Sequence, residues 1–214
     1  MAPPSDRKNR RFITGQDVQA LPEGAILDLP KDAILTDVAR EWIARKKIRV
    51  VTAESSPSSQ PEKARVAVGS DHAGFQMKED IKTLLAEQGI SFIDFGTSST
   101  ESVDYPDFAH AVALAVAVGR TELGIVVDGA GIGSAIAANK VPGVRAAPCS
   151  DEATARNSRE HNDANVLTLG ARLISKETMD RVVRAFLASQ ITEERHRRRV
   201  RKVTRIERKY YRDV

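Results

Sequence analysis

Between residues 65 and 190, short apolar segments alternate with helical patterns, and this alternation is what most constrains the fold. The apolar segments predict strands at residues 65–69, 91–95, 123–127, 144–149 and 165–169. Helical patterns lie between and after them, at residues 75–88, 106–118, 134–139, 151–160, 176–190 and 193–211. Apolar strands that alternate with helices indicate an α/β fold, with a parallel sheet covered on both faces and right-handed crossovers.

A segment rich in Ser, Pro and charge, residues 52–63 (TAESSPSSQPEK), predicts a flexible linker because it has almost nothing to bury. It separates a small N-terminal module, residues 1–51, from a larger domain, residues 64–214.

The module itself has modest structural signals. Thr14 is placed to cap a short helix, and Thr36 to cap an amphipathic helix that runs through Lys46. Residues 25–29 and 48–51 predict strands.

The composition is that of a soluble globular protein, with 41% apolar and 29% charged residues among 214. No apolar run is long enough to span a bilayer, and residues 1–11 lack a hydrophobic signal core, so a cytoplasmic protein without a membrane partner is expected. The single cysteine, Cys149, excludes an internal disulfide. The four histidines show no metal-ligand spacing, so no metal site is expected.

The net charge of +4 is concentrated at the C-terminus. Residues 193–214 carry ten Lys or Arg against four Asp or Glu, so this segment alone has six net positive charges and the rest of the chain is slightly acidic. The domain therefore lacks the broad cationic surface that duplex binding needs, and nucleic acid is not the expected partner.

The turn at residues 127–134 (VDGAGIGS) carries the main chemical signal. Its three glycines let backbone N–H groups converge into a nest that binds anions. A carboxylate at the entrance, Asp128, could take a proton from carbon while the nest holds the resulting oxyanion, which suggests enolate chemistry. The alternatives are a plain strand-to-helix turn with Asp128 as a cap, and a dinucleotide fingerprint whose third glycine would fall on Ser134.

Polar residues follow three of the predicted strands: Asp71 with His72, Asp128 with its nest, and Asp151. Ligands of open parallel sheets bind outside the carboxyl ends of the strands.

From residue 66 to about residue 199 the chain resembles the ribose-5-phosphate isomerase B family, which includes the galactose-6-phosphate isomerase subunits. The resemblance rests on ordered blocks at residues 69–78 (GSDHAGFQMK), 94–109 (DFGTSSTESVDYPDFA), 129–147 (GAGIGSAIAANKVPGVRAA), 158–172 (SREHNDANVLTLGAR) and 194–200 (ERHRRRV). It implies a three-layer α/β/α sandwich with a five-stranded parallel, Rossmann-like sheet. It also implies an intramolecular oxidoreductase that interconverts aldose and ketose sugar phosphates. The family uses no cofactor or metal and acts as a homodimer with active sites at the interface; assembly beyond the dimer is left open.

The resemblance also implies roles for individual residues. Asp71 would contact the sugar, His72 the phosphate, and Tyr105 would line the sugar pocket. His161 would open the sugar ring, with Asn162 beside it. Phosphate binding would fall to Arg172, Arg195 and Arg199, whose guanidinium forks suit a phosphate dianion. The anion hole for a cis-enediolate would comprise Gly129, Ala130, Gly131, Ile132, Gly133 and Ser134.

Each role has a plainer alternative. Asp71 could cap the helix that starts near Phe75, and His72 and His161 could be polar surface groups. His110 and His196 are interpreted as such surface groups. A basic helix such as the one predicted from residue 193 is usually a solvated face.

Two departures from the family fall at the chemistry. The chain has Asp128-Gly129-Ala130-Gly131 where many members have Cys-Gly-Thr-Gly, and it has Ser134 where others place a Glu base. The hypothesis is that Asp128 replaces the cysteine base, with a pKa that partial burial raises toward neutrality. Loss of the Thr hydroxyl at Ala130 points to a tetrose 4-phosphate, which cannot close a furanose ring, whereas the retained His161 points to a cyclic pentose phosphate.

Residues 11–51 resemble a short module of some bacterial microcompartment enzymes, which implies packing into a shell. A solubilising or dimer-extending appendage is the alternative. Two rival functions for the whole chain are a non-catalytic sugar-phosphate-binding or scaffold protein, and a nucleic-acid-binding protein that uses the C-terminal basic helix.

Overall fold

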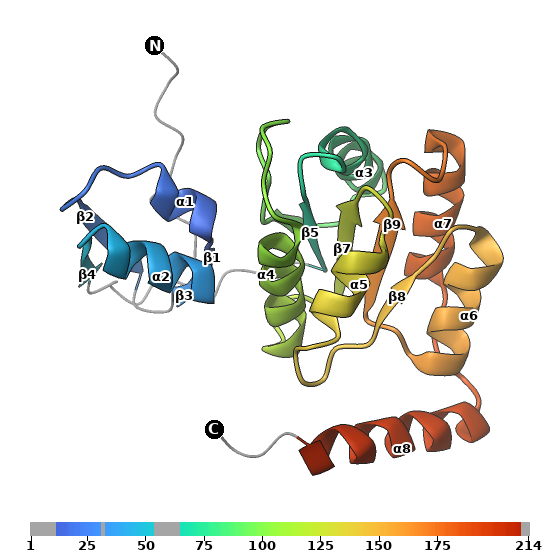
Figure 1. Ribbon diagram of the computed structural model, residues 1–214. Coiled ribbons are helices and arrows are strands. Elements are labelled where there is room, and N and C mark those ends of the chain that lie inside the picture. The colour runs from blue at the N-terminus through green and yellow to red at the C-terminus, as the bar shows by residue number, and fades with distance from the viewer. Residues whose placement is uncertain (1–11, 31–32, 54–64, 211–214) are drawn as a thin grey trace. The chain divides into compact units, whose positions relative to one another are not determined.

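The computed structural model describes residues 12–30, 33–53 and 65–210 (Figure 1). The chain forms two compact units, Met1–Glu62 and Lys63–Val214. Of the predicted linker, Thr52 and Ala53 are the last residues of a strand, and residues 54–63 lie outside the described residues.

In the N-terminal unit, residues 12–30 and 33–53 form two short helices and two pairs of parallel strands. Its elements are β1 (Phe12–Ile13), α1 (Gly15–Gln19), β2 (Ile26–Pro30), β3 (Ile34–Leu35), α2 (Asp37–Arg45) and β4 (Arg49–Ala53). Strand β1 pairs with β3, and β2 pairs with β4. The predicted helices and the two predicted strands are confirmed, whereas β1 and β3 were not expected because two-residue strands are too short to show a period.

Both predicted caps of this unit are in place. Thr14 donates its N–H (3.0 Å) and its hydroxyl (2.9 Å) to the Asp17 carboxylate at the start of α1. The Thr36 hydroxyl accepts a hydrogen bond from the Ala39 N–H (3.2 Å) in the first turn of α2. These bonds satisfy groups that a helix leaves unpaired at its first turn.

The C-terminal unit has the predicted alternation of strands and helices. Its elements are β5 (Val66–Ser70), α3 (Phe75–Glu87), β6 (Phe92–Asp94), α4 (Tyr105–Ala117), β7 (Leu123–Asp128), α5 (Ile132–Ala138), β8 (Ala146–Pro148), α6 (Glu152–Asn162), β9 (Val166–Gly170), α7 (Lys176–Ala188) and α8 (Glu194–Tyr210). The five strands form one sheet in the order β6-β5-β7-β9-β8. All pairs are parallel, so the predicted fold class is confirmed. Tyr211, the last residue of the predicted final helix, lies outside the described residues.

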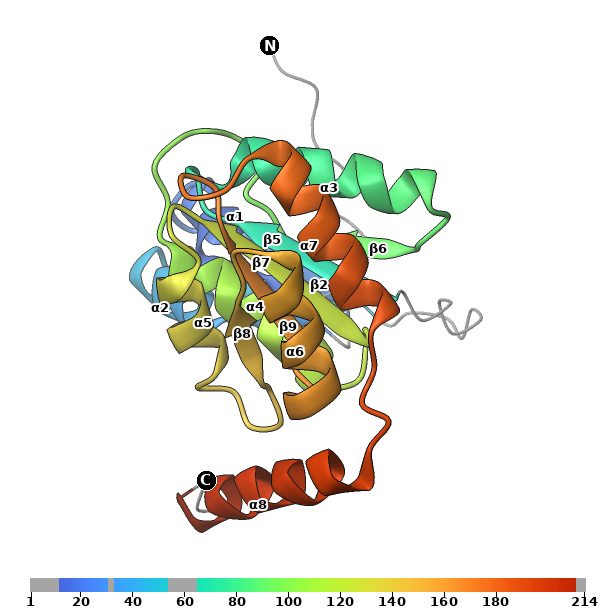
Figure 2. The same cartoon turned by 90° about the vertical axis from the view of Figure 1, so that its right-hand side faces the viewer.

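The sheet lies between two layers of helices. Helices α4 and α5 cover one face, and α3, α6 and α7 cover the other (Figure 1, Figure 2). Helix α3 covers the sheet because one of its faces is apolar. The side chains on that face recur at helical spacing and are buried in the main core: Met77, Ile81, Leu84 and Leu85. Helix α8 packs against α6 and runs beneath the sandwich (Figure 2), where the Glu207 carboxylate accepts the Gly143 N–H at 3.0 Å.

The turns that follow the central strands and the end of helix α6 lie at opposite edges of the sheet. Strands β5, β7 and β9 end at Ser70, Asp128 and Gly170, so the turns after them lie at the carboxyl edge. Helix α6 follows β8 and runs back toward the amino edge. Its end is fixed there by Arg145, which precedes β8 and donates its Nε–H to the carbonyls of Asn162 (3.1 Å) and Asp163 (2.8 Å).

The core under α7 offers a test of this packing. Phe186 is fully buried, and the Arg159 guanidinium lies 5.3 Å from the centre of its ring. We expect Phe186→Ala to lower the free energy of unfolding by about 3–5 kcal/mol, because it leaves a cavity between α7 and the sheet. Urea unfolding measures this, with the exposed Arg184→Ala on the same helix as control, expected within about 0.5 kcal/mol of the parent. Equal effects of the two substitutions would contradict the described core.

Candidate active site at the carboxyl edge of the sheet

The glycine-rich turn after β7 is shaped by close contact with the end of β9. Gly131 has a φ of +77°, and a Cβ there would lie 2.9 Å from the Leu169 carbonyl carbon. The Thr168 hydroxyl donates to the Gly131 carbonyl at 2.7 Å. Gly131 therefore needs both the left-handed backbone and the missing side chain that glycine provides.

The nest formed by this turn holds the carboxylate of Asp128. One oxygen, Oδ1, accepts hydrogen bonds from the N–H of Ala130 (2.7 Å) and the N–H of Gly131. The other, Oδ2, accepts from the N–H of Ser134 (2.9 Å). The residue is only 4% exposed. The backbone donors expected to hold a substrate oxyanion thus hold the chain's own anion in this structure.

These bonds decide the direction in which the pKa of Asp128 moves. Burial alone raises the pKa, but the Ser134 hydroxyl and the N–H groups of Gly131, Ser134 and Ala130 outweigh it, so the pKa lies below its ordinary value. The expectation that partial burial raises this pKa toward neutrality is therefore wrong.

Two further predicted residues lie directly against the nest. The Tyr105 ring, from the first turn of α4, lies over Gly133, where a Cβ would come within 2.7 Å of its Cζ. The Arg172 side chain runs past Gly129, whose added Cβ would lie 3.7 Å from both Cδ and Nε. Arg172 is anchored there because its N–H donates to the Gly129 carbonyl at 3.1 Å.

Asp71 and His72 occupy the neighbouring turn, after β5. The buried Asp71 carboxylate accepts the Gly74 N–H at 2.9 Å, and the Asp71 N–H donates to the Val127 carbonyl (3.1 Å), which ties this turn to β7. The half-buried His72 places Nδ1 3.2 Å from the Val103 N–H nitrogen and 3.1 Å from the Val103 carbonyl oxygen. Asp71 thus closes the turn that leads into α3, but the N-cap of that helix is Gly74, so Asp71 is not the helix cap of the plainer alternative.

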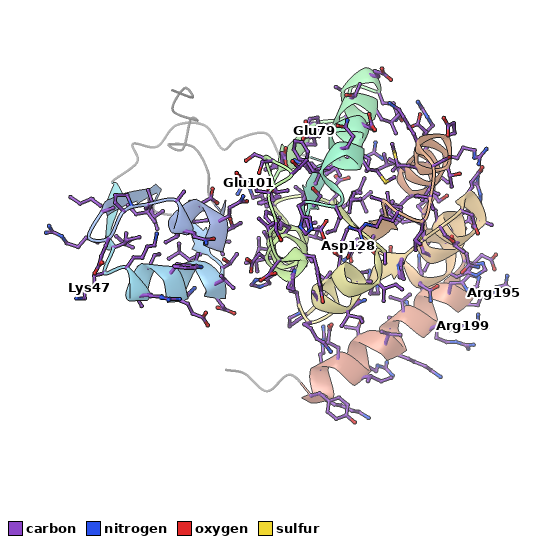
Figure 3. All side chains as sticks on the ribbon, turned by 45° about the horizontal axis from the view of Figure 1, so that its top comes forward. Lys47, Glu79, Glu101, Asp128, Arg195 and Arg199 are labelled. Atoms are coloured by element: carbon purple, nitrogen blue, oxygen red, sulfur yellow. The ribbon has the colours of Figure 1, made fainter. Side chains whose placement is uncertain are left out.

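The remaining predicted residues gather elsewhere. His161 and the exposed Asn162 lie at the end of α6, where the His161 Nδ1 is 2.8 Å from the Asn157 amide nitrogen. Arg195 and Arg199 lie on α8, well away from Asp128 (Figure 3). Arg195 pairs with Glu193, with Nη2 to Oε1 at 3.2 Å. Within one chain, the predicted site residues therefore form two groups: the nest with Asp71, His72, Tyr105 and Arg172, and the α6–α8 group with His161, Asn162, Arg195 and Arg199.

His196 was interpreted from the sequence as a surface group, and this is wrong. It is 4% exposed, and its ring stacks on that of His161 with 4.1 Å between centroids and an interplanar angle of 14°. The available signal was its position between Arg195 and Arg199, both implied to bind phosphate. Helical periodicity alone could not reveal the burial, because α6 supplies the covering surface.

The described part of the chain offers no metal centre. Among residues 12–30, 33–53 and 65–210, no three His, Cys, Asp or Glu side chains are grouped so that they could hold a metal ion. Cys149 is buried, and burial raises the pKa of its thiol. No helix in the described part of the chain has the length and apolar character needed to cross a membrane.

The bonds to Asp128 predict a pH-dependent contribution to stability. In Asp128→Asn an amide nitrogen would replace one carboxylate oxygen and face a backbone N–H, so we expect the free energy of unfolding at pH 7 to fall by about 1–3 kcal/mol. Because the folded pKa is lowered, the carboxylate stabilises the fold above its unfolded value near 3.8, and this contribution is lost as the pH falls through the folded value. The difference between variant and parent should therefore shrink at pH 3.

Urea unfolding at pH 7 and pH 3 measures the effect. The matched control is Asp151→Asn, since Asp151 caps α6 by accepting the Thr154 N–H (2.7 Å) and Asn caps helices equally well. A loss of the same size for Asp128→Asn at both pH values would contradict the charged hydrogen bonds described above.

Comparison with known proteins places this chain in a family. A sequence model of the ribose/galactose isomerase family matches residues 66–203. Ribose-5-phosphate isomerase B of Escherichia coli is 46% identical over 143 residues, which cover 67% of this chain and 96% of that protein. The putative sugar phosphate isomerase YwlF of Bacillus subtilis is 40% identical over 146 residues, 68% of this chain and 98% of that protein.

Solved structures agree. Ribose-5-phosphate isomerase B of Clostridium thermocellum has a TM-score of 0.68 at 48% identity, covering 69% of this chain and 99% of that one. The Mycoplasma genitalium enzyme, solved with bound ribulose-5-phosphate, has a TM-score of 0.65 at 37% identity, covering 67% of this chain and 96% of that one. The nest, the sheet order and these matches together show that the chain belongs to the ribose/galactose isomerase family.

Proposed function

We propose that the C-terminal unit interconverts the aldose and ketose forms of a phosphorylated sugar through a cis-enediolate. The observation that carries this proposal is the occupied nest, in which three backbone N–H groups hold the two oxygens of one carboxylate. A cis-enediolate also presents two neighbouring oxygens on one side, so the same donors suit it. Relatives with this fold include ribose-5-phosphate isomerase B of several bacteria and protozoa.

Asp128 acts as the base in this proposal, and substrate binding activates it. When the sugar carbonyl oxygen takes the N–H donors of the nest, the Asp128 carboxylate loses the hydrogen bonds that hold its pKa down. It remains desolvated, and desolvation raises the pKa. The carboxylate then removes the C2 proton of the aldose, the electron pair forms the C1–C2 double bond, and the negative charge goes to the carbonyl oxygen. Return of the proton from the carboxylic acid to C1 gives the ketose, with one proton passing between the two oxygens.

Ala130 and His161 favour different classes of sugar phosphate as the substrate. At position 130 a methyl group stands where many members of the family have a hydroxyl that assists ring opening, which favours a tetrose 4-phosphate. His161 retains the acid–base group for opening a furanose, which favours a pentose 5-phosphate such as ribose 5-phosphate. We propose that both classes are accepted.

A second copy of the chain completes the site in this proposal. The nest and the α6–α8 group lie apart in one chain, so a homodimer can join the nest of one protomer to His161, Asn162, Arg195 and Arg199 of the other. Exposed apolar side chains on both surfaces support this: Ile132 (56%), Ile136 (59%) and Leu173 (65%) near the nest, and Val203 (52%), Ile206 (57%) and Tyr210 (81%) along α8.

One observation favours the non-catalytic alternative. Because the nest is filled by the protein's own carboxylate with a lowered pKa, a chain that only binds sugar phosphates could have kept the fold without the chemistry. The microcompartment role of residues 11–51 stays a prediction.

Proton NMR of pentose and tetrose phosphates in D2O tests the proposed reaction. We expect isomerisation with deuterium entering at C1 of the ketose and, through the reverse reaction, at C2 of the aldose. Asp128→Asn should lose about 10²–10⁴ in rate, because a general base is removed. Asp128→Cys should retain more activity than Asp128→Asn, since a thiolate can also take the proton. The control Asp151→Asn should match the parent. Tight binding of every sugar phosphate without exchange would establish the non-catalytic alternative.

Mixing two inactive variants tests the shared site. In a mixed dimer of Asp128→Asn and Arg199→Ala, one site carries both substitutions and the other carries neither. We therefore expect co-expressed variants to recover about a quarter of the parent activity, because half of the dimers are mixed and each has one intact site. Arg198→Ala, an exposed neighbour on α8, should be active alone. No recovery from dimers shown to be mixed would mean that each chain forms its own site.

A further inference from the structure

We propose that His196 is a positioning residue that holds His161 and Arg199 in fixed relation, so that ring opening and phosphate binding act on one sugar. This inference rests on the proposed function, which assigns those two roles. His196 lies in the first turn of α8 and is 4% exposed. A nearly buried imidazole on a helix that otherwise carries so many exposed charges needs a structural or functional reason.

The ring face of His196 is directed at His161. The two rings are nearly parallel, at 14°, with 4.1 Å between their centroids. His161 belongs to α6 and His196 to α8, so this stack joins the two helices at the residue proposed to open the sugar ring. The stack limits rotation of the His161 ring, which leaves fewer orientations for its proton-carrying nitrogen.

The ring edge of His196 is directed at Arg199. The Arg199 Nη1 lies 3.5 Å from the His196 Nδ1. A guanidinium can only donate, so Nδ1 acts as the acceptor and the neutral ring carries its proton on Nε2. Nε2 makes no hydrogen bond within the described residues, and the Oε2 atom of Glu193 lies 4.0 Å from it.

The charges around the pair keep His196 neutral. Burial lowers the pKa of His196, and the nearby His161, Arg195 and Arg199 lower it further against the opposing effect of Glu193. From α6, Arg156 and Glu160 line the same pocket of about 250 Å³, and the end of α7 contributes only uncharged residues, 188–190. A neutral His196 accepts from Arg199 and adds no second positive charge beside His161 when that ring takes up a proton.

The arrangement suits one chemical sequence. His161 takes the proton of the anomeric hydroxyl and delivers it to the ring oxygen as the C1–O ring bond breaks and the C1 carbonyl forms. Arg199 meanwhile holds the phosphate at the other end of the sugar. Because one imidazole contacts both residues, the distance between the acid–base group and the phosphate site is set by His196 and not by either long side chain alone.

Two substitutions separate the functions of the ring. His196→Phe keeps a stacking ring and removes the Nδ1 acceptor, whereas His196→Asn keeps an acceptor near the Nδ1 position and removes the stack. We expect His196→Phe to raise KM for sugar phosphates about three- to tenfold with little change in kcat, the effect of one lost hydrogen bond. We expect His196→Asn to lower kcat for ribose 5-phosphate while leaving kcat for the open-chain tetrose 4-phosphate unchanged. His110→Phe and His110→Asn, at the half-buried histidine of α4, are the matched controls.

A double variant at His196 and Arg199 distinguishes loss of the proposed interaction from loss of folding. Arg199→Ala should cost far more activity than His196→Phe, because it removes the proposed phosphate contact itself. In kcat/KM, the double variant should be no worse than Arg199→Ala alone, because the Nδ1 contact of His196 acts only through Arg199. The proposal is overturned if both His196 variants change KM and kcat by the same factors, if they stay within twofold of the parent, or if the double variant is additive.

The role of His196 can still be tested if the proposed isomerase activity is not found. If the parent protein isomerises no sugar phosphate, calorimetry of ribose 5-phosphate binding replaces kinetics. His196→Phe should then weaken binding and His196→Asn should not, while the NMR signals of His161 lose their ring-current shift only in His196→Asn. Equal affinities for parent and His196→Phe, or an unchanged shift in His196→Asn, would overturn the inference in that case.

Discussion

The site depends on the hydrogen bonds between the Asp128 carboxylate and the backbone of the turn that follows it. Three N–H groups, from Ala130, Gly131 and Ser134, point at one pair of oxygens, and this requires a left-handed residue at Gly131. The turn also packs on the end of β9, where a Cβ on Gly170 would lie 2.7 Å from the Ala130 carbonyl. Strand β7, the start of α5 and the end of β9 are thus joined around one charge.

That arrangement links binding to chemistry. The same N–H donors can hold either the protein's carboxylate or a substrate oxyanion, but not both. While they hold the carboxylate they lower its pKa and make it a weak base; without them, burial acts in the opposite direction. In the proposed function, activation of the base by its own substrate would follow from Asp128 standing where many members of the resembled family have Cys, since a thiolate would compete less well for backbone donors.

The second half of the proposed site follows from the direction of the helices. In a parallel α/β sheet the strands end at one edge and the connecting helices return to the other. His161 comes late in α6, whose end Arg145 fixes at the amino edge, so it cannot meet Asp128 within one chain. Helix α8 packs on α6, so the ring of His196 in its first turn stacks on the ring of His161.

The sequence by itself determined the alternation of strands and helices, the caps at Thr14 and Thr36, and the position of the glycine turn after a buried strand. These features are local, because period, capping and glycine content act over a few residues. Only the tertiary structure decided the strand order β6-β5-β7-β9-β8, the direction of the Asp128 pKa shift and the burial of His196. The pKa depends on how donors converge when β9 packs against the turn, and the burial depends on α6 covering α8. The pKa shift and the burial therefore both depend on contacts between segments that are distant in the sequence, and a short sequence pattern does not encode such contacts.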